Sequence, residues 1–238
     1  MKIFKSFFLF TSLFSVFLIT GCKKDDNVNP QNDNPPQFTV KTIRVPDAMA
    51  QSNDPGAQQT ASYLNMMNGI AGYSDMMREH SKSITVKGLK DSGPRIFTWD
   101  VDEGNTHCTF TLTVTETDIL IKWKMVIDGI MDGDKFDNFL FLEAQEYKDG
   151  TNSRITVYDP ENPGIILMKM SWTKENDVYH FIFEVPENLQ IVVDINIDNS
   201  GTMDVNEWID NEWAVVFNAV WGPDGHGQWH DNNGNGSW

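Results

Sequence analysis

Apolar and polar residues alternate with a period of two along most of the chain from residue 95 to residue 238. The alternating segments end at clusters of turn-forming residues such as Pro186-Glu187-Asn188. This pattern is typical of strands that place one face on a core, and its regular spacing predicts hairpins in an antiparallel meander. The apolar positions of successive segments include Phe110, Leu112, Val114, Trp123, Met125, Ile127, Ile166, Met168, Met170, Phe181, Phe183, Ile191, Val193, Phe217 and Ala219.

The expected meander holds about ten or more strands, and sheets of that size usually curl or split rather than stay flat. We therefore predict a mainly β protein whose antiparallel meander forms a curved sheet, a partial barrel or a sandwich, with a short helical segment packed against it. These three arrangements stay open at this point. Val192, Val216 and Val220 also make the second face of some strands apolar. We expect the helical segment to cover that second face in places.

Helical periodicity is confined to about residues 54–80. Asp54 is suited to cap the first turn, and Pro55 fits the first helical position, where a backbone N–H is not needed. Gly69 and Gly72 each disfavour a helix interior by about 1 kcal/mol relative to Ala, which predicts a break or kink near them. The apolar face of this segment includes Ala57, Leu64, Met67, Ile70, Tyr73 and Met77.

The start of the chain combines a basic end with a long apolar run. Residues 1–21 have the pattern of a secretory signal peptide. The run that ends in Ile19-Thr20-Gly21-Cys22 resembles the lipobox of bacterial lipoproteins. That resemblance implies cleavage before Cys22, lipidation of this residue and attachment to a membrane through the lipidated N-terminus. It implies a location in the bacterial cell envelope, at the outer membrane or on the cell surface.

The rest of the chain divides into a tether and a domain. Residues 22–36 are rich in Asn, Pro and charged residues, so we expect a disordered tether. Residues 37–238 are then expected to form a single β-rich domain. Its first strand is expected at residues 38–44, where apolar and β-branched residues precede Pro46.

Charge and cysteine content exclude some classes of partner and of fold. The 238-residue chain has a formal net charge of −16, and loss of Lys2 and Lys5 with the signal peptide takes it to −18. Such a surface repels phosphate backbones, so we expect no nucleic-acid partner. Cys22 and Cys108 are the two cysteines, too few for a disulfide scaffold, and we expect Cys108 to be an inert buried thiol. The sequence leaves the oligomeric state open.

The stretch from Asn196 to Glu207 comes closest to a chemical motif. As an EF-hand loop it would place oxygen-bearing side chains at the calcium ligand positions and Gly201 at the turn. However, residues 189–197 alternate as a strand, where an EF-hand needs a helix. We therefore favour a β-hairpin with its turn at residues 198–201. We expect no cofactor, with calcium at this loop as the alternative. The calcium positions of the alternative are Asn196, Asp198, Ser200, Thr202, Asp204 and Glu207.

Two further loops carry local predictions. Asp132, Asp134 and Asp137 cluster in residues 128–138, where we expect a long solvated turn rather than the alternative, a loop that holds a hard cation. Near the end, residues 225–229 and 234–238 repeat the pattern G-x-G-x-W. The two repeats flank turn-forming residues and predict a closing hairpin.

Signatures of catalysis such as G-x-S-x-G and H-E-x-x-H are missing from the sequence, which favours a non-enzymatic protein. We expect it to bind an apolar or amphipathic ligand between helix and sheet. The alternative is a glycan- or protein-binding surface module that uses exposed Trp residues, with or without calcium. The order of helix and long meander resembles the incomplete barrels of the lipoprotein-carrier family, which implies an architecture but no residue roles. Because Met adapts to varied shapes, the expected lining of the apolar site is Met66, Met67, Met76 and Met77.

Overall fold

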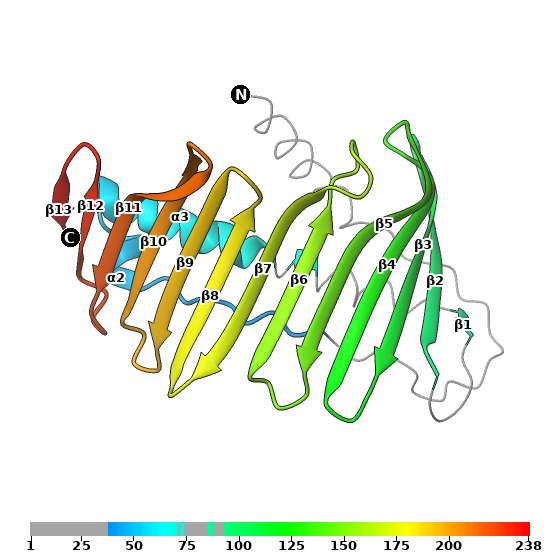
Figure 1. The fold of residues 1–238 in the computed structure, drawn as a ribbon, viewed down its shortest axis with the longest axis horizontal. Coiled ribbons are helices and arrows are strands. Elements are labelled where there is room, and N and C mark those ends of the chain that lie inside the picture. The colour runs from blue at the N-terminus through cyan, green and yellow to red at the C-terminus, as the bar shows by residue number, and fades with distance from the viewer. Residues whose placement is uncertain (1–37, 71, 74–84, 88–92) are drawn as a thin grey trace. The chain divides into compact units, whose positions relative to one another are not determined.

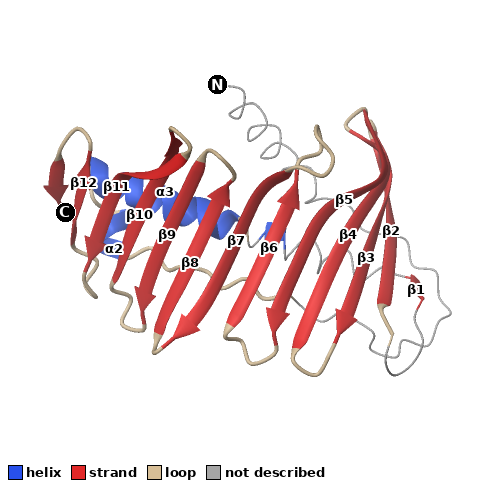
Figure 2. Cartoon of the chain, in the orientation of Figure 1, coloured by secondary structure: helices blue, strands red, loops and turns tan. Residues whose placement is uncertain are grey.

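The alternating pattern folds into one antiparallel sheet. A computed structural model describes residues 38–70, 72–73, 85–87 and 93–238, all within the compact unit Asn34–Trp238. Thirteen strands lie side by side in sequence order, and each pairs antiparallel with the next (Figures 1 and 2). The elements are α2 Asp47–Ala50, α3 Pro55–Gly69, β1 Thr85–Lys87, β2 Arg95–Glu103, β3 Thr106–Glu116, β4 Leu120–Met131, β5 Asp134–Tyr147, β6 Asn152–Tyr158, β7 Ile166–Glu175, β8 Val178–Val185, β9 Leu189–Asn196, β10 Gly201–Ile209, β11 Glu212–Trp221, β12 Gly227–Asp231 and β13 Asn235–Ser237.

The predicted antiparallel meander is confirmed. Its sheet is open, and it is neither closed into a barrel nor divided into a sandwich. Among the described strands, β1 pairs only with β2, and β13 pairs only with β12. Two-residue turns join several hairpins. Asn176 and Asp177 have φ of 46° and 66°, and Asp210 and Asn211 have φ of 53° and 67°. Such positive values match the twist of paired strands, and Asn and Asp adopt them more readily than most residues.

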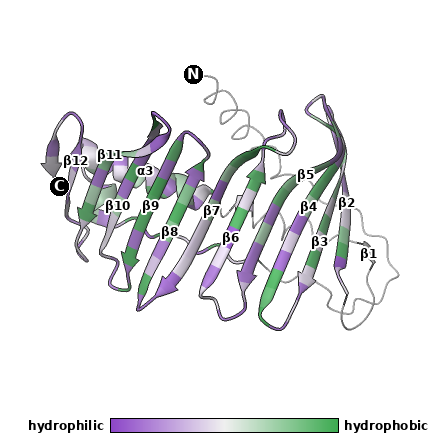
Figure 3. Cartoon of the chain, in the orientation of Figure 1, coloured by the Kyte–Doolittle hydropathy of each residue, from purple (hydrophilic) through white to green (hydrophobic). Residues whose placement is uncertain are grey.

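Hydrophobic and hydrophilic residues alternate along several strands (Figure 3), and because successive side chains of a strand point to opposite sides, the sheet has two chemically different faces. On one side, which we call the open face, polar side chains such as Thr113, Lys124 and Glu143 reach solvent. The opposite side, the covered face, buries large apolar side chains, each of which stabilises the fold by about 1.5–3 kcal/mol. The covered face includes Phe97, Leu112, Val114, Trp123, Met125, Ile127, Leu142, Ile155, Val157, Phe181, Phe183, Ile191, Val193, Val205 and Phe217.

The segment ahead of the sheet crosses the covered face. The ring of Phe38 meets that of Trp123 in β4 edge-on, with 5.1 Å between centroids. Three residues later, Lys41 Nζ lies 4.6 Å from the centroid of the Tyr179 ring in β8. Figures 1 and 2 then show α3 passing behind the C-terminal strands. Five residues of the two helices are 0% exposed: Met49, Ala57, Thr60, Leu64 and Met67.

Residues 38–46 form no strand, so the first strand predicted at residues 38–44 is wrong. The side chain of Asn68 in α3 takes the place of a partner strand. Its Oδ1 accepts a hydrogen bond from the Ile43 N–H, and its Nδ2 donates one to the Ile43 carbonyl oxygen, both at 2.7 Å. The backbone polar groups of this buried residue are therefore satisfied by the helix rather than by the sheet.

Helix α3 begins where the sequence predicts. Asp54 Oδ1 accepts hydrogen bonds from two backbone N–H groups of the first turn, at 2.8 and 3.1 Å, and Pro55 occupies the first helical position. The helix ends at Gly69, close to the expected break. Residues 74–80 of the predicted helical segment lie outside the described residues. Over the ranges that the structure describes, no helix combines the length and apolar character needed to cross a membrane.

Two glycines allow close approaches that a larger residue would block. A Cβ on Gly56 of α3 would overlap the indole ring of Trp229, so this glycine lets the helix rest on β12. Gly129 of β4 has a φ of 124°, and a Cβ there would collide with the backbone of His107 and Cys108 on β3. It lies beside a register shift between β4 and β5, where a bulge bends the sheet.

The closing hairpin predicted from the repeated G-x-G-x-W pattern is confirmed as β12 and β13. Trp229 pairs with Gly236 across the two strands. The Trp229 ring stacks on Phe217 of β11 at 6.3 Å between centroids, which fixes the hairpin to the rest of the covered face.

Two local expectations are wrong. The acidic stretch predicted as a long turn is two strands joined by Asp132-Gly133 alone, because β4 continues to Met131 and β5 starts at Asp134. The helices also do not cover the second apolar face. Val220 lies on the open face and is 48% exposed. Valine suits an extended backbone even where its side chain stays in solvent, so its presence did not require a cover.

We expect Leu64→Ala to lower the free energy of unfolding by about 2–5 kcal/mol, because it removes fully buried apolar volume between α3 and the sheet. Asn65→Ala, one residue away and exposed in the same helix, is the matched control and should change it by less than about 0.5 kcal/mol. Chemical denaturation of the full chain measures both values. Equal stability of the two variants would contradict the packing described.

Candidate functional site

The structure separates the residues expected to line an apolar site. Met67 is 0% exposed and belongs to the packing of α3 on the sheet, whereas Met66 is half-buried. Met76 and Met77 lie outside the described residues, as does Cys22. In the described part of the chain, Met67 is therefore packed in the core and does not line a cavity.

The hairpin favoured over a calcium loop is confirmed, since β9 and β10 pair along their length. Asp198 Oδ1 accepts hydrogen bonds from the hydroxyl and backbone N–H of Ser200, at 2.7 and 3.0 Å, and these bonds lower the pKa of the carboxyl. Glu207 lies six residues beyond Gly201 along β10, about 20 Å away at 3.3 Å per residue. The candidate calcium ligands, including Asn196 and Asp204, thus belong to one hairpin but do not converge on a single ion position. Within the described ranges, no three His, Cys, Asp or Glu side chains gather to hold a metal ion.

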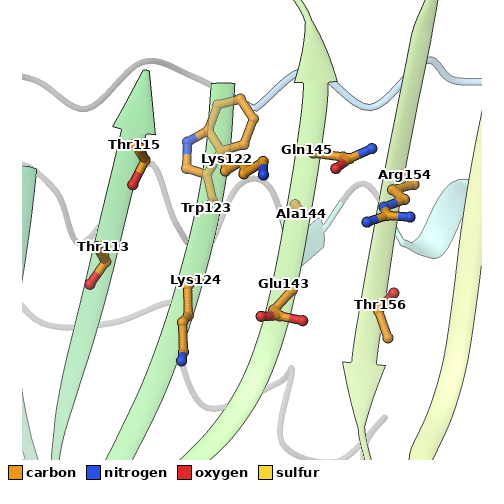
Figure 4. Close-up of a pocket in the computed structure, with 10 residues that line it drawn as sticks. All are labelled: Thr113, Thr115, Lys122, Trp123, Lys124, Glu143, Ala144, Gln145, Arg154 and Thr156. Carbon is orange, nitrogen blue, oxygen red and sulfur yellow. The ribbon is translucent and has the colours of Figure 1, made fainter. Parts of the chain in front are cut away.

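A pocket of about 300 Å³ lies on the open face, across β3, β4, β5 and β6 (Figure 4). That volume is at the lower end of the range for ligand sites. Each strand contributes two polar residues at alternate positions, and strand pairing aligns them as two rows. One row is Thr113, Lys124, Glu143 and Thr156, and the other is Thr115, Lys122, Gln145 and Arg154.

The pocket is positively charged, whereas the chain as a whole is acidic. Lys122, Lys124 and Arg154 face one acidic residue, Glu143, in a protein whose net charge is −16. In the described part of the structure, none of these three cations forms an ion pair, although other lysines and arginines of the sheet do. Unpaired cations attract anions over roughly a Debye length, about 8 Å at physiological salt.

Glu143 accepts a hydrogen bond from Tyr158 and forms no ion pair with Lys124 in the described structure. The two charged residues face each other across β4 and β5. The Tyr158 hydroxyl of β6 instead donates a hydrogen bond to Glu143 Oε2 at 2.8 Å. Burial raises the pKa of Tyr158, and the bond to Glu143 and its charge raise it further, so the phenol stays protonated and donating at neutral pH. Lys124 itself forms no ion pair in the described part of the chain.

The remaining polar groups suit a ligand that carries hydroxyls as well as negative charge. The guanidinium of Arg154 can bind a carboxylate or sulfate through two parallel hydrogen bonds, and lysine ammonium groups add charge-assisted ones. Threonine hydroxyls and the Gln145 amide both donate and accept, as sugar hydroxyls require. The arrangement can thus bind an anionic polyol on an open surface.

Sequence reasoning missed this pocket, although part of its signal was visible. Lys122 and Lys124 flank the buried Trp123 in an alternating segment, so both had to lie on the face away from the core. The threonines of residues 109–115 alternate in the same way. What the sequence did not show is that Arg154 joins them, because that depends on the register of β4, β5 and β6.

Comparison with known protein families, curated proteins and solved structures finds no match to this chain.

Cys108 is a potential nucleophile with a strongly shifted pKa, outside the pocket. It is free and 5% exposed on β3. Burial, with the nearby charges of Asp100 and Asp132, raises the pKa of its thiol to about 11. Because the thiolate is the reactive form, this residue is inert at neutral pH.

We expect the Cys108 thiol of the native full chain, carrying Cys22→Ser, to resist a thiol-specific reagent at about pH 8. With a pKa about three units higher, only roughly 0.1% of the thiol is ionised, and burial blocks access as well. Unfolding returns the pKa toward about 8.5, so one thiol should then react rapidly. A native thiol that reacts as fast as the unfolded one would contradict its burial.

Proposed function

We propose that this protein is a lipid-anchored, non-enzymatic binding module of the bacterial cell envelope, and that it binds an acidic glycan on its open face. The anchor rests on the lipobox-like run that ends at Cys22. The binding activity rests on one observation: three cations without ion-pair partners, Lys122, Lys124 and Arg154, in a hydroxyl-lined pocket of the described sheet.

An acidic glycan fits the charges better than a nucleic acid does. A nucleic-acid strand carries one negative charge every 3.4 Å or so, and the chain's net charge of −16 repels such a dense polyanion. A glycan with one carboxylate per sugar is less densely charged. Its hydroxyls can also use the Thr113, Thr115 and Thr156 hydroxyls, which a phosphate backbone does not need.

An apolar ligand between helix and sheet, the first expectation from the sequence, stays a prediction. The described side chains that reach this space, including Leu64 and Met67, are fully buried against protein. The open face instead offers Lys122, Lys124 and Arg154, which form no ion pair in the described part of the chain. For this reason the described structure supports binding on the open face more directly.

We expect Cys22→Ser to release the protein from the envelope. Without a sulfur to carry lipid, the chain lacks the acyl groups that hold it stably at a membrane. Metabolic labelling with a fatty acid, followed by fractionation of the cells, measures this. Labelling and membrane retention equal to the unsubstituted chain would contradict the anchor.

We expect the full chain, purified in detergent, to bind homogalacturonan oligomers and to bind their fully methyl-esterified counterparts much more weakly. The two probes share a backbone and differ in the carboxylate charge. Lys124→Ala and Arg154→Ala should each weaken binding about five- to tenfold, and added salt should weaken it further. Lys135→Ala, an exposed lysine of β5 outside the pocket, is the charge-matched control and should leave affinity unchanged.

Tyr158→Phe tests the arrangement of the pocket independently of its total charge. It removes the hydroxyl that holds Glu143, which can then pair with Lys124, so we expect weaker binding of the same oligomer. Calorimetry or fluorescence titration measures these affinities. Equal affinity for charged and methyl-esterified oligomers, or for a single-stranded oligodeoxynucleotide of matched charge, would overturn the proposed function.

A further inference from the structure

The polar row of the pocket continues across the open face toward the C-terminal strands. Thr156 of the pocket faces Lys169 on β7, whose Nζ lies 2.7 Å from Glu184 Oε1 on β8. Gln190 on β9 donates a hydrogen bond to Glu184 at 3.5 Å, and Asn206 on β10 donates one to Gln190 at 3.4 Å. Neighbouring strands are thus linked, side chain to side chain, from β7 to β10.

This row leads to two tryptophans at the end of the β10–β11 hairpin. Trp208 and Trp213 pair across the strands, with 5.0 Å between ring centroids and an angle of 71° between ring planes. Trp208 lies two positions beyond Asn206 on β10, so the pair shares the open face. Both rings are partly exposed, and neighbouring Val215 is 55% exposed.

A cross-strand Trp pair also stabilises a hairpin, so its position alone does not indicate binding. The tryptophans differ in the surroundings of their indole N–H groups. Trp221 and Trp238 donate theirs to the carbonyl oxygens of Asn199 and Gly225, at 2.9 and 2.6 Å, and those of Trp172 and Trp229 are buried without an acceptor in the described part of the chain. Neither N–H of the Trp208–Trp213 pair finds an acceptor in the described part of the chain, and neither is buried.

We propose that Trp208 and Trp213 form a second subsite for the same glycan chain. The negative face of an indole ring attracts the C–H bonds of a sugar ring, and the free N–H groups can donate to sugar hydroxyls. Asp194 and Asp204 also lie on this half of the open face, paired with His180 and Asn218. The second subsite therefore recognises the sugar ring rather than its charge.

The separation of the two subsites indicates what the ligand must be. Six strand spacings divide β4 from β10, which amounts to about 30 Å at roughly 4.8 Å each. A short oligosaccharide fits the basic pocket but does not reach the Trp pair. The ligand class that uses both is an acidic polysaccharide, and this inference rests on the proposed function.

The test compares homogalacturonan of two lengths on the full chain. A dodecamer should bind about 100-fold or more tightly than a dimer, because its second contact becomes intramolecular. Trp208→Ala and Trp213→Ala should weaken dodecamer binding about tenfold or more and dimer binding less than about twofold. Lys124→Ala should weaken the binding of both dimer and dodecamer. Added salt should reduce the effect of this substitution but not the effects of the two Trp substitutions.

A direct readout covers the case in which a Trp variant loses its hairpin. In the unsubstituted chain with ¹⁵N-labelled tryptophan, the indole N–H signals of Trp208 and Trp213 should shift with dodecamer and not with dimer. The Trp221 signal should stay unchanged as the internal control, because its N–H already has a protein acceptor.

The outcomes distinguish the two proposals. Tight dodecamer binding that depends on Lys124 but leaves the Trp208 and Trp213 signals unmoved overturns the second subsite and leaves the basic pocket standing. Failure of both lengths to bind overturns the proposed function and the subsite with it. Indole shifts with dodecamer, lost in Trp208→Ala, support both.

Discussion

Burial of one face of a single sheet is the constraint on which the rest of this structure depends. The thirteen strands that the structure describes lie in one open layer, and no second sheet packs on them within the described residues, so the segment ahead of them supplies the cover. Phe38, Ile43 and Leu64 do so from coil and helix. Asn68 makes this arrangement possible, because its side chain satisfies both backbone polar groups of Ile43 without adding a strand.

Covering one face leaves the other free for polar chemistry. Residues of the open face contribute little to the core, so their identities are not restricted by packing. Three cations on this face form no ion pair within the described residues, in a chain of net charge −16, and this is the basis on which we propose a site for an anion. The one carboxylate that lines the pocket, Glu143, accepts a hydrogen bond from Tyr158 and forms no ion pair with Lys124 in the described structure. The Trp208–Trp213 pair lies on the same face, where an extended chain can contact it and the pocket together.

How far the sequence predicts this protein differs from feature to feature. The meander, the α3 start at Asp54 and the hairpin at residues 189–209 follow from local signals: period-two alternation, a capping carboxylate and turn residues. The strand predicted at residues 38–44 failed because alternation shows that a segment is extended, not what satisfies its backbone. The long turn predicted around Asp132 failed because acidic residues also suit the exposed positions of strands near a two-residue turn.

The sequence by itself determined the start of α3, most strands of the meander and the apolar face of those strands, since these depend on neighbours a few residues away. It also carries the lipobox-like run at Cys22, which needs no fold to be recognised. Only the tertiary structure decided that the sheet stays open and which face the helices cover. It also decided that Lys122, Lys124 and Arg154 share one pocket. These features depend on the register of β4, β5 and β6 and on the packing of distant segments, for which residue order alone carries no local signal.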